Sequence, residues 1–265
     1  MEKEKSKKFM FCTSWKMNLD VSEGIEYARK LVRFLDSGVK NIDKLEIFIF
    51  PDFLSLYPVS EIARNTALRF GAQDCFWEDR GALTGEVSPL FLKKLACSYV
   101  IIGHPERIIH LKEDNMMINM KIKAVLKNHM NPLLLVFQRK QYTNQGQAFK
   151  IIKKQLLLKL EGISLPDISR IIIVFEPLWA IGTGKTTSVE HISEVALKLR
   201  ELLDSEFGEG TGQKQKLMYG GGVTLENIDR IINVENIDGI GMGRAAIDFD
   251  FFKKAIIKIL DNKEF

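Results

Sequence analysis

Eight short apolar runs, each rich in β-branched and aromatic residues, recur along the chain. Stretches with helical periodicity lie between them. The runs cover residues 9–15, 45–50, 68–73, 98–103, 132–137, 171–175, 216–220 and 238–242. They are continuous rather than alternating, which is typical of parallel strands covered on both faces. Eight strand–helix repeats predict a (β/α)8 barrel, although an open doubly wound sheet would show similar runs.

Helical periodicity is clear in five of the intervening stretches, and capping residues mark where several helices should begin. The periodic stretches are 24–35, 89–95, 116–127, 189–203 and 251–260. Ser88-Pro89 and His104-Pro105 each place a proline in a first turn, and Ser188 precedes a third helix. The helices should therefore begin directly after loops that carry polar residues.

Composition favours one domain over residues 1–265, because no Ser-, Gly- or Pro-rich linker divides the chain. The formal charge of +4 is too small to indicate nucleic-acid binding, and no apolar run is long enough to span a membrane or form a signal peptide. Cys12, Cys75 and Cys97 form no C-x-x-C pair and should be reduced core residues. The four histidines lack metal-ligand spacing, so we expect no structural zinc. These features predict a cytoplasmic protein.

The sixth apolar run ends in an acidic residue, Glu176, within the segment FEPLWAIGTGK. A carboxylate in that position is costly to desolvate, which indicates a functional role. The stiff Pro177, the bulky Trp179 and the permissive glycines after them are typical of a hinged lid over a base. The GTGKT stretch is not a P-loop, because Trp179 stands where that motif needs its first glycine.

Other chemically useful residues follow other predicted strands. Lys16 follows the first run and His104 the fourth, while glycine clusters at 220–222 and 241–243 follow the seventh and eighth. A lone lysine or histidine is usually a surface or packing residue, and glycines after strands are usually turns. Their joint occurrence at the strand ends of a barrel predicts one site with a base, a hydrogen-bond donor, a fixed positive charge and a phosphate seat.

The chain resembles the triosephosphate isomerase family over nearly its whole length, which implies the TIM-barrel form of the (β/α)8 fold. The matching segments are SWKMN, GAQD, GALTGEVSP, GHPER, FEPLWAIGTGK, YGGGVT and DGIGMG, in the family's order. The resemblance implies isomerisation of a small phosphorylated sugar through an enediolate, in glycolysis and gluconeogenesis. Glu176 would be the base, His104 a neutral donor to the oxyanion, and Lys16 the electrostatic partner.

Further roles are implied by the same resemblance. The amide of Glu106 would donate to the second ring nitrogen of His104. Gly182, Gly222 and Gly243 would offer backbone to the phosphate under the closed lid, and no metal or organic cofactor would be needed. The loop 79–88, with Thr84 at its tip, would enter the active site of a neighbouring subunit and so predicts a homodimer. The alternative is that this loop caps its own barrel.

Several residues depart from the family pattern near the substrate. Ser14 replaces an asparagine that contacts substrate, Pro105 a serine that holds the base in the open form, and Gly222 another serine. The residues after the fifth strand, 136–139, also differ. Arg244 stands where a second glycine is usual, and it could either bind a phosphate in a bidentate manner or pair with Asp248.

Three functions therefore stay open on sequence alone. The first is triosephosphate isomerisation. The second is isomerisation of four-carbon tetrulose phosphates by the same mechanism, which the Gly-Arg pair together with Trp77 and Asp79 favours. The third is a catalytically impaired barrel that binds a phosphate ligand or regulates a partner, which the altered neighbours of the site favour and the intact catalytic trio disfavours.

Overall fold

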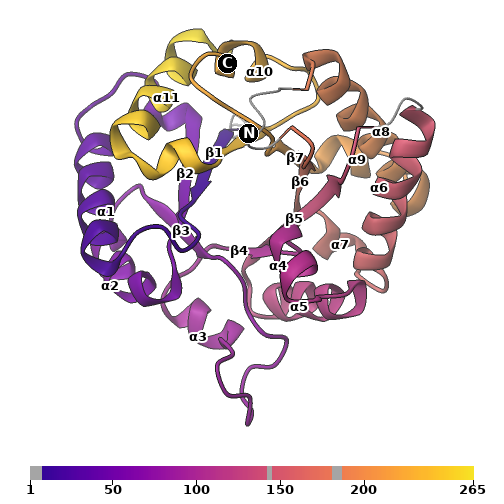
Figure 1. Cartoon of the computed structure of the whole chain (residues 1–265), viewed down its shortest axis with the longest axis horizontal. Coiled ribbons are helices and arrows are strands. Elements are labelled where there is room, and N and C mark those ends of the chain that lie inside the picture. The colour runs from indigo at the N-terminus through magenta and orange to yellow at the C-terminus, as the bar shows by residue number, and fades with distance from the viewer. Residues whose placement is uncertain (1–7, 142–144, 181–186) are drawn as a thin grey trace, which may run out of the picture.

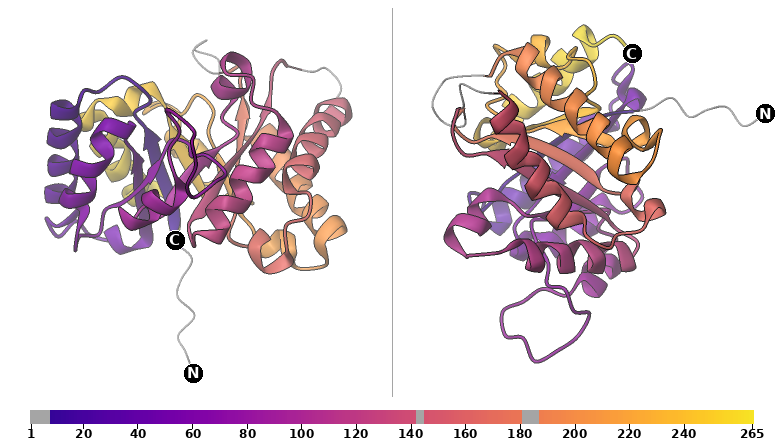
Figure 2. Two further views of the ribbon diagram at one scale, coloured as in Figure 1. Left: turned by 90° about the horizontal axis from the view of Figure 1, so that it is seen from below. Right: turned by 90° about the vertical axis from the view of Figure 1, so that its right-hand side faces the viewer.

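The chain forms a closed barrel of eight parallel strands surrounded by helices, as the sequence predicts. The computed structural model describes residues 8–141, 145–180 and 187–265. Figure 1 looks down the barrel, with the strands at the centre and the helices in a ring around them; Figure 2 gives two side views. The strands follow one another around the barrel in chain order, and β8 pairs with β1. This closure excludes the open doubly wound sheet.

The eight strands fall within or close to the predicted apolar runs. They are β1 (Phe9–Ser14), β2 (Leu45–Phe50), β3 (Arg69–Ala72), β4 (Tyr99–Ile102), β5 (Asn131–Gln138), β6 (Ile172–Pro177), β7 (Lys216–Tyr219) and β8 (Gly239–Met242). The register of β5 against β6 pairs Phe137 with Glu176, so β5 runs beside the sixth strand as far as the acidic residue.

The helices that follow the strands are of very different lengths. They are α1 (Val21–Leu35), α2 (Phe53–Ala63), α3 (Pro89–Lys94), α4 (Pro105–His110), α5 (Asn115–Lys127), α6 (Gln145–Leu160), α7 (Leu165–Ile168), α8 (Val189–Phe207), α9 (Thr211–Lys214), α10 (Ile228–Ile231) and α11 (Phe249–Asn262). Two 3₁₀ turns complete the ring, η1 (Ile42–Lys44) and η2 (Arg244–Ile247).

Side-chain caps explain where the main helices begin. Ser88 accepts from the amide of Phe91 and Ser188 from that of His191, so both predicted start signals are confirmed. His104 caps α4 with its imidazole, and Pro105 takes the first position, where no amide partner is needed. Asp20 forms a capping box with Glu23 and starts α1 earlier than periodicity alone predicts.

Apolar side chains fill two separate layers, which is why the strands read as continuous apolar runs. The inner layer fills the barrel, and the outer layer lies between the strands and the helices. The inner layer contains Met10, Cys12, Phe48, Phe50, Tyr99, Ile101, Leu133, Leu135, Ile172, Val174 and Met218. Cys12, Cys75 and Cys97 are all buried and carry free thiols, as predicted.

The segment between β3 and α3 does not lie over its own barrel. It extends away from the ring of helices (Figures 1 and 2), with exposed side chains from Gly81 to Glu86 and Thr84 in the turn at its tip. This arrangement disagrees with the alternative that the loop caps its own barrel. Among the helices that the structure describes, none is both long and apolar enough to cross a bilayer.

Candidate active site

The C-terminal ends of the strands form one face of the barrel, called the mouth here, and the three predicted catalytic residues lie there. Lys16 follows β1, His104 follows β4, and Glu176 is near the end of β6. Lys16 influences the pKa of both His104 and Glu176, which places its charge near both groups. The fold thus joins three residues that are far apart in sequence, as predicted.

Lys16 is held in an unusual conformation by its surroundings. Its φ is +51°, in the left-handed region that few residues other than glycine adopt. Its carbonyl accepts from Nε2 of Gln73 at 2.9 Å, and its amide lies 3.4 Å from the hydroxyl of Ser14. Its ammonium pairs with the carboxylate of Glu106 across the mouth. Strain of this kind, fixed by hydrogen bonds, is typical of a functional position.

His104 has a defined tautomer. The amide of Glu106 donates to Nδ1 at 3.2 Å, which is the interaction that the family resemblance implies. In the neutral ring the proton then lies on Nε2, so that nitrogen is a donor. Burial, and then the nearby Lys16 cation, lower the pKa of His104 to about 4. The imidazole is therefore neutral at physiological pH. The α4 N-terminus contributes the capping geometry, while burial is the main cause of the shift.

Glu176 is a carboxylate kept largely from water. Burial raises its pKa to about 8, opposed by Lys16 and assisted by Glu106. No side chain in the described part of the chain forms a hydrogen bond with its carboxylate. A Cβ at Gly220 would lie 3.0 Å from Oε1, so this glycine leaves the carboxylate room. A base with a raised pKa, free of hydrogen-bond partners, is suited to accept a proton from a substrate.

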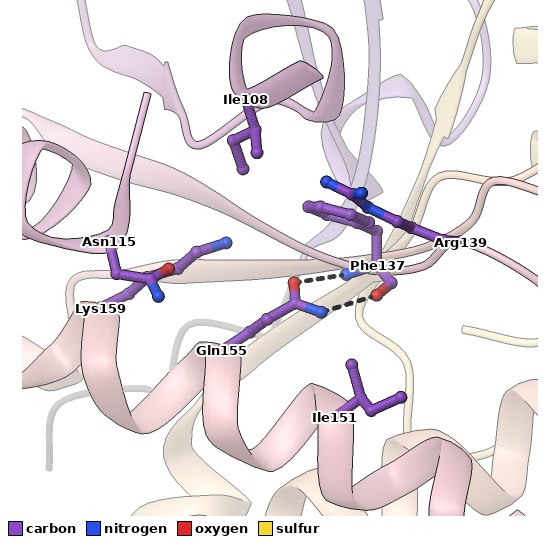
Figure 3. Close-up of a pocket in the computed structure, with 7 residues that line it drawn as sticks. All are labelled: Ile108, Asn115, Phe137, Arg139, Ile151, Gln155 and Lys159. Atoms are coloured by element: carbon purple, nitrogen blue, oxygen red, sulfur yellow. Dashed lines mark hydrogen bonds between the residues drawn. The ribbon is translucent and has the colours of Figure 1, made fainter. Parts of the chain in front are cut away.

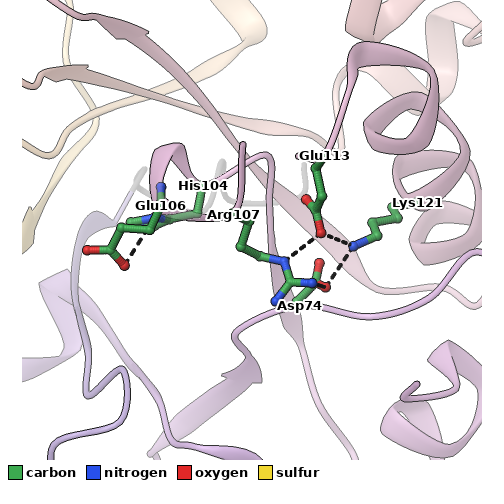
Figure 4. Close-up of polar contacts among 6 residues, drawn as sticks. All are labelled: Asp74, His104, Glu106, Arg107, Glu113 and Lys121. Carbon is green, nitrogen blue, oxygen red and sulfur yellow. Dashed lines mark hydrogen bonds and ion pairs between the residues drawn. The ribbon is translucent and has the colours of Figure 1, made fainter. Parts of the chain in front are cut away.

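A buried network of charges holds α4 in place (Figure 4). Arg107, on α4, binds Asp74 at 2.8 Å and Glu113 at 2.6 Å. Lys121, on α5, bridges the same two carboxylates at 2.7 and 2.5 Å and is almost fully buried. Because Arg107 is one residue from Glu106, the network fixes the amide that orients His104.

Glycines and one arginine complete the mouth at β7 and β8. Gly222 has a φ of +58°, a conformation that a serine there would adopt only at a cost. A Cβ at Gly243 would meet nothing within 4 Å, so the backbone there is open to a ligand. Arg244 is exposed and forms no ion pair with Asp248, whose carboxylate instead caps α11. The ion pair that the sequence left open is therefore absent.

The first part of the predicted lid packs on the end of β5. The amide of Leu178 donates to the carbonyl of Gln138 at 2.9 Å, and that of Ala180 to the carbonyl of Pro177 at 2.9 Å. Gln138 also contacts Nε2 of His191, on α8, at 3.1 Å. Gly182 and the rest of the lid up to residue 186 lie outside the described residues.

One supporting residue, Gln73, was not predicted from the sequence, and neither was the ion pair of Glu106. Glu106 was chosen for its amide, but its carboxylate also pairs with Lys16. Gln73, within the GAQD segment, holds the Lys16 loop through two carbonyls, those of Lys16 and Phe50. The signal was available, because a polar residue at the end of β3 must face the mouth. Within the described ranges, no group of three or more histidine, cysteine or acidic side chains is arranged to hold a metal ion.

The comparisons with known proteins agree with this geometry. The family model described as triosephosphate isomerase matches residues 9–259. A triosephosphate isomerase of Thermoanaerobacter pseudethanolicus is 36% identical over 92% of this chain and 96% of its own length. One of Dehalococcoides mccartyi is 38% identical over 90% and 91%, and one of Dictyoglomus thermophilum 36% over 90% and 94%. The chain belongs to the triosephosphate isomerase family.

Proposed function

We propose that this protein is a triosephosphate isomerase, which interconverts dihydroxyacetone phosphate and glyceraldehyde 3-phosphate. The observation that carries the proposal is the pairing at the mouth of a carboxylate with a raised pKa and a neutral imidazole donor. The names of the relatives give the substrate, a small phosphorylated sugar. We also propose that the protein acts in the cytoplasm, in glycolysis and gluconeogenesis.

The proposed mechanism moves one proton between neighbouring carbons. The carboxylate of Glu176 takes a proton from the carbon next to the carbonyl, and the carbonyl oxygen gains negative charge. Nε2–H of His104 donates to this oxygen, and the ammonium of Lys16 stabilises the charge. The hydroxyl proton passes through the His104 imidazole to the former carbonyl oxygen, and the protonated Glu176 returns its proton to the other carbon, so the carbonyl forms at the former hydroxyl position. A neutral imidazole suits this step, because its pKa matches the weakly acidic enediol better than an imidazolium would.

The phosphate is proposed to lie near β7 and β8. Backbone at Gly222 and Gly243 would donate to it, and the segment that includes Gly182 would close over it. Closure would exclude water and so suppress loss of phosphate from the enediolate. Ser14 is proposed to line the substrate side of β1, where its hydroxyl already lies near the Lys16 amide.

A homodimer is proposed from the shape of the β3–α3 segment. Thr84 lies in an exposed turn of this arm, which leaves its own barrel, and Met17, next to Lys16, is 94% exposed. The base of the arm is tied to its own barrel through Asp79, which pairs with Lys127, but residues 81–86 are exposed. This exposed end and an apolar side chain beside the site fit a second copy of the chain.

Arg244 supports a second candidate substrate, a four-carbon tetrulose phosphate. Its guanidinium is exposed near the proposed phosphate seat and is not paired with Asp248. An arginine there can form a bidentate contact with a phosphate displaced by one carbon.

Isomerase assays with glyceraldehyde 3-phosphate and with erythrulose phosphates, run side by side, test both candidates. Glu176→Gln should lower kcat/KM by about 10³-fold or more, since it removes the base. Arg244→Gly should change the ratio of kcat/KM values between the two substrates if the arginine selects chain length. Binding of substrate without turnover above the Glu176→Gln variant would instead favour the third candidate, a phosphate-binding or regulatory barrel.

A further inference from the structure

A second cavity lies outside the barrel, between the end of β5, helix α6 and the start of α5 (Figure 3). Its volume is about 220 Å³. Neither the catalytic trio nor the glycines at β7 and β8 line it. The lining residues are Ile108, Asn115, Phe137, Arg139, Ile151, Gln155 and Lys159. The cavity is thus distinct from the catalytic trio, although Phe137 in its wall pairs in register with Glu176.

Lys159 is the most unusual residue in this lining. Its side chain is fully buried (0% exposed), and Figure 3 shows its ammonium directed toward the space between the labelled residues. Nζ donates to the carbonyl of Leu135 at 2.8 Å and lies 5.5 Å from the centre of the Phe137 ring. The ammonium group has three donors, and no carboxylate in the described part of the chain pairs with it. A buried cation without a counter-charge is costly, so an anion beside this ammonium group would stabilise its charged form.

Arg139 supplies a second cation at the same cavity. It is exposed, and its guanidinium lies 6.0 Å from the centre of the Phe137 ring. It also forms no ion pair with the residues that the structure describes. Gln155 binds the backbone of Phe137 through both ends of its amide, at 2.9 and 3.4 Å, and so fixes the wall between the two cations.

The β5 and α6 side of the cavity is free of acidic residues, whereas Asp114 precedes Asn115 on the α5 side. Residues 131–160 contain no aspartate and no glutamate. They contain six basic residues, Arg139, Lys140, Lys150, Lys153, Lys154 and Lys159. A local excess of positive charge raises the concentration of anions near the cavity. The basic side chains of β5 and α6 therefore favour an anion, although Lys153 is paired with Glu206.

We propose that this cavity binds a small organic anion, whose acid group pairs with Lys159 and Arg139 and whose short apolar body packs on Ile108, Phe137 and Ile151. The apolar walls distinguish such a ligand from a simple inorganic ion, which would leave them uncovered. Burial lowers the pKa of Lys159 to about 7, so the amine is about half protonated at neutral pH. An acid group beside it would restore that charge.

Calorimetric titration of the full-length protein with three probes of similar size tests the proposal. Butyrate carries a carboxylate, propyl phosphate a phosphate, and butyramide no charge. We expect at least one of the two anions to bind at least tenfold more tightly than butyramide. The comparison between the anions shows which acid group the cavity prefers. Equal binding of butyramide and both anions, or no binding of either anion at millimolar concentration, would overturn the proposal.

Matched variants assign the binding to the cavity rather than to the mouth. Lys159→Met should weaken binding of the preferred anion by about tenfold or more, and Arg139→Gln should weaken it as well. Lys154→Met removes an exposed lysine from the same helix and should change the affinity by less than about twofold. Unchanged affinity in both Lys159→Met and Arg139→Gln would contradict the assignment.

A second experiment uses the wild-type protein, because replacing the buried Lys159 can also alter folding. The NMR chemical shifts of the backbone amides of Phe137 and Gln155 should change when the anion is added. No shift on addition of the anion would also refute the proposal.

Discussion

At the scale of single residues, Glu176 combines a proposed catalytic role with a cost to folding. Its carboxylate lies beside Gly220 and near the buried Tyr219, whose hydroxyl has no hydrogen-bond partner within the described residues. The surroundings of Glu176 favour the neutral carboxyl group. A protein that must hold an ionised base there gives up stability for reactivity.

We predict that Glu176→Gln raises the free energy of unfolding while it removes activity. The folded-state pKa of about 8 lies above the ordinary 4.5, so the wild type loses stability as pH rises from about 4.5 through about 8. That difference sets an upper bound of about 5 kcal/mol. Partial exposure of Glu176 reduces the expected gain to about 2 kcal/mol above pH 8. Urea unfolding at pH 5 and pH 8.5 would measure it, and an equal gain at both pH values would contradict the assigned cause.

His104 provides a second prediction at this scale. Because its pKa is lowered to about 4, the ring should stay neutral from pH 5 to 9, with its proton on Nε2. The unfolded chain takes up the proton first as pH falls below about 6.5, so this residue costs stability progressively from there down to about pH 4. Nitrogen-15 chemical shifts of the two ring nitrogens would report the tautomer directly. A proton on Nδ1 would contradict the observed cap.

At the scale of elements, α4 is a short helix held by charges in addition to the packing of Pro105 and Ile108. Only Pro105 among its residues is buried. Arg107 connects it to Asp74, after β3, and to Glu113, before α5. Burial raises the pKa of Asp74 to about 6 even though Lys121 and Arg107 oppose the shift. The network is therefore sensitive to the loss of either cation.

Lys121→Met should lower the free energy of unfolding by about 3–4 kcal/mol, because it leaves two neighbouring carboxylates buried with one cation. Adding Asp74→Asn to this variant should recover part of the loss, since it removes one of those charges. Lys123→Met removes an exposed lysine from the same helix and should change stability by less than about 0.5 kcal/mol. Denaturant unfolding of the four proteins gives the comparison, and a loss below 1 kcal/mol for Lys121→Met would show that the network is not needed.

The elements could be predicted from sequence because their signals are local. Apolar runs located the strands, and residues such as Ser88 and Ser188 marked helix starts. Lys16, His104 and Glu176 could be selected because the end of a barrel strand fixes where a residue lies. The pairing of Lys16 with Glu106 depends on the distance across the mouth between residues 90 positions apart, which no local pattern contains. In the sequence, Lys159 cannot be distinguished from the other lysines of its basic helix. Only the tertiary packing shows that it is buried.

At the scale of the whole molecule, several large apolar side chains of the single barrel are exposed to water on neighbouring connections. Met17 exposes 94% of its side chain, Leu54 78%, Tyr57 62% and Leu83 39%. They lie on three successive connections, after β1, in α2, and between β3 and α3. The last of these connections is the arm that extends from the barrel in Figure 1. Burying these side chains between two copies would remove their apolar surface from water.

We predict that the protein elutes at about twice the mass of the 30.3 kDa chain and that Met17→Arg converts it to a monomer. An arginine at this exposed position fits a single barrel, but two copies would bring its unpaired charge into an apolar interface. Because Met17 follows Lys16 directly, loss of the partner should also loosen that strained residue and lower kcat by about 10²-fold or more. Light scattering after size-exclusion chromatography would measure the mass.

Met116→Arg, on α5, is the matched control, since Met116 is 67% exposed and should tolerate the change in a dimer. A monomeric wild type with full activity would mean that the arm and Met17 serve another purpose.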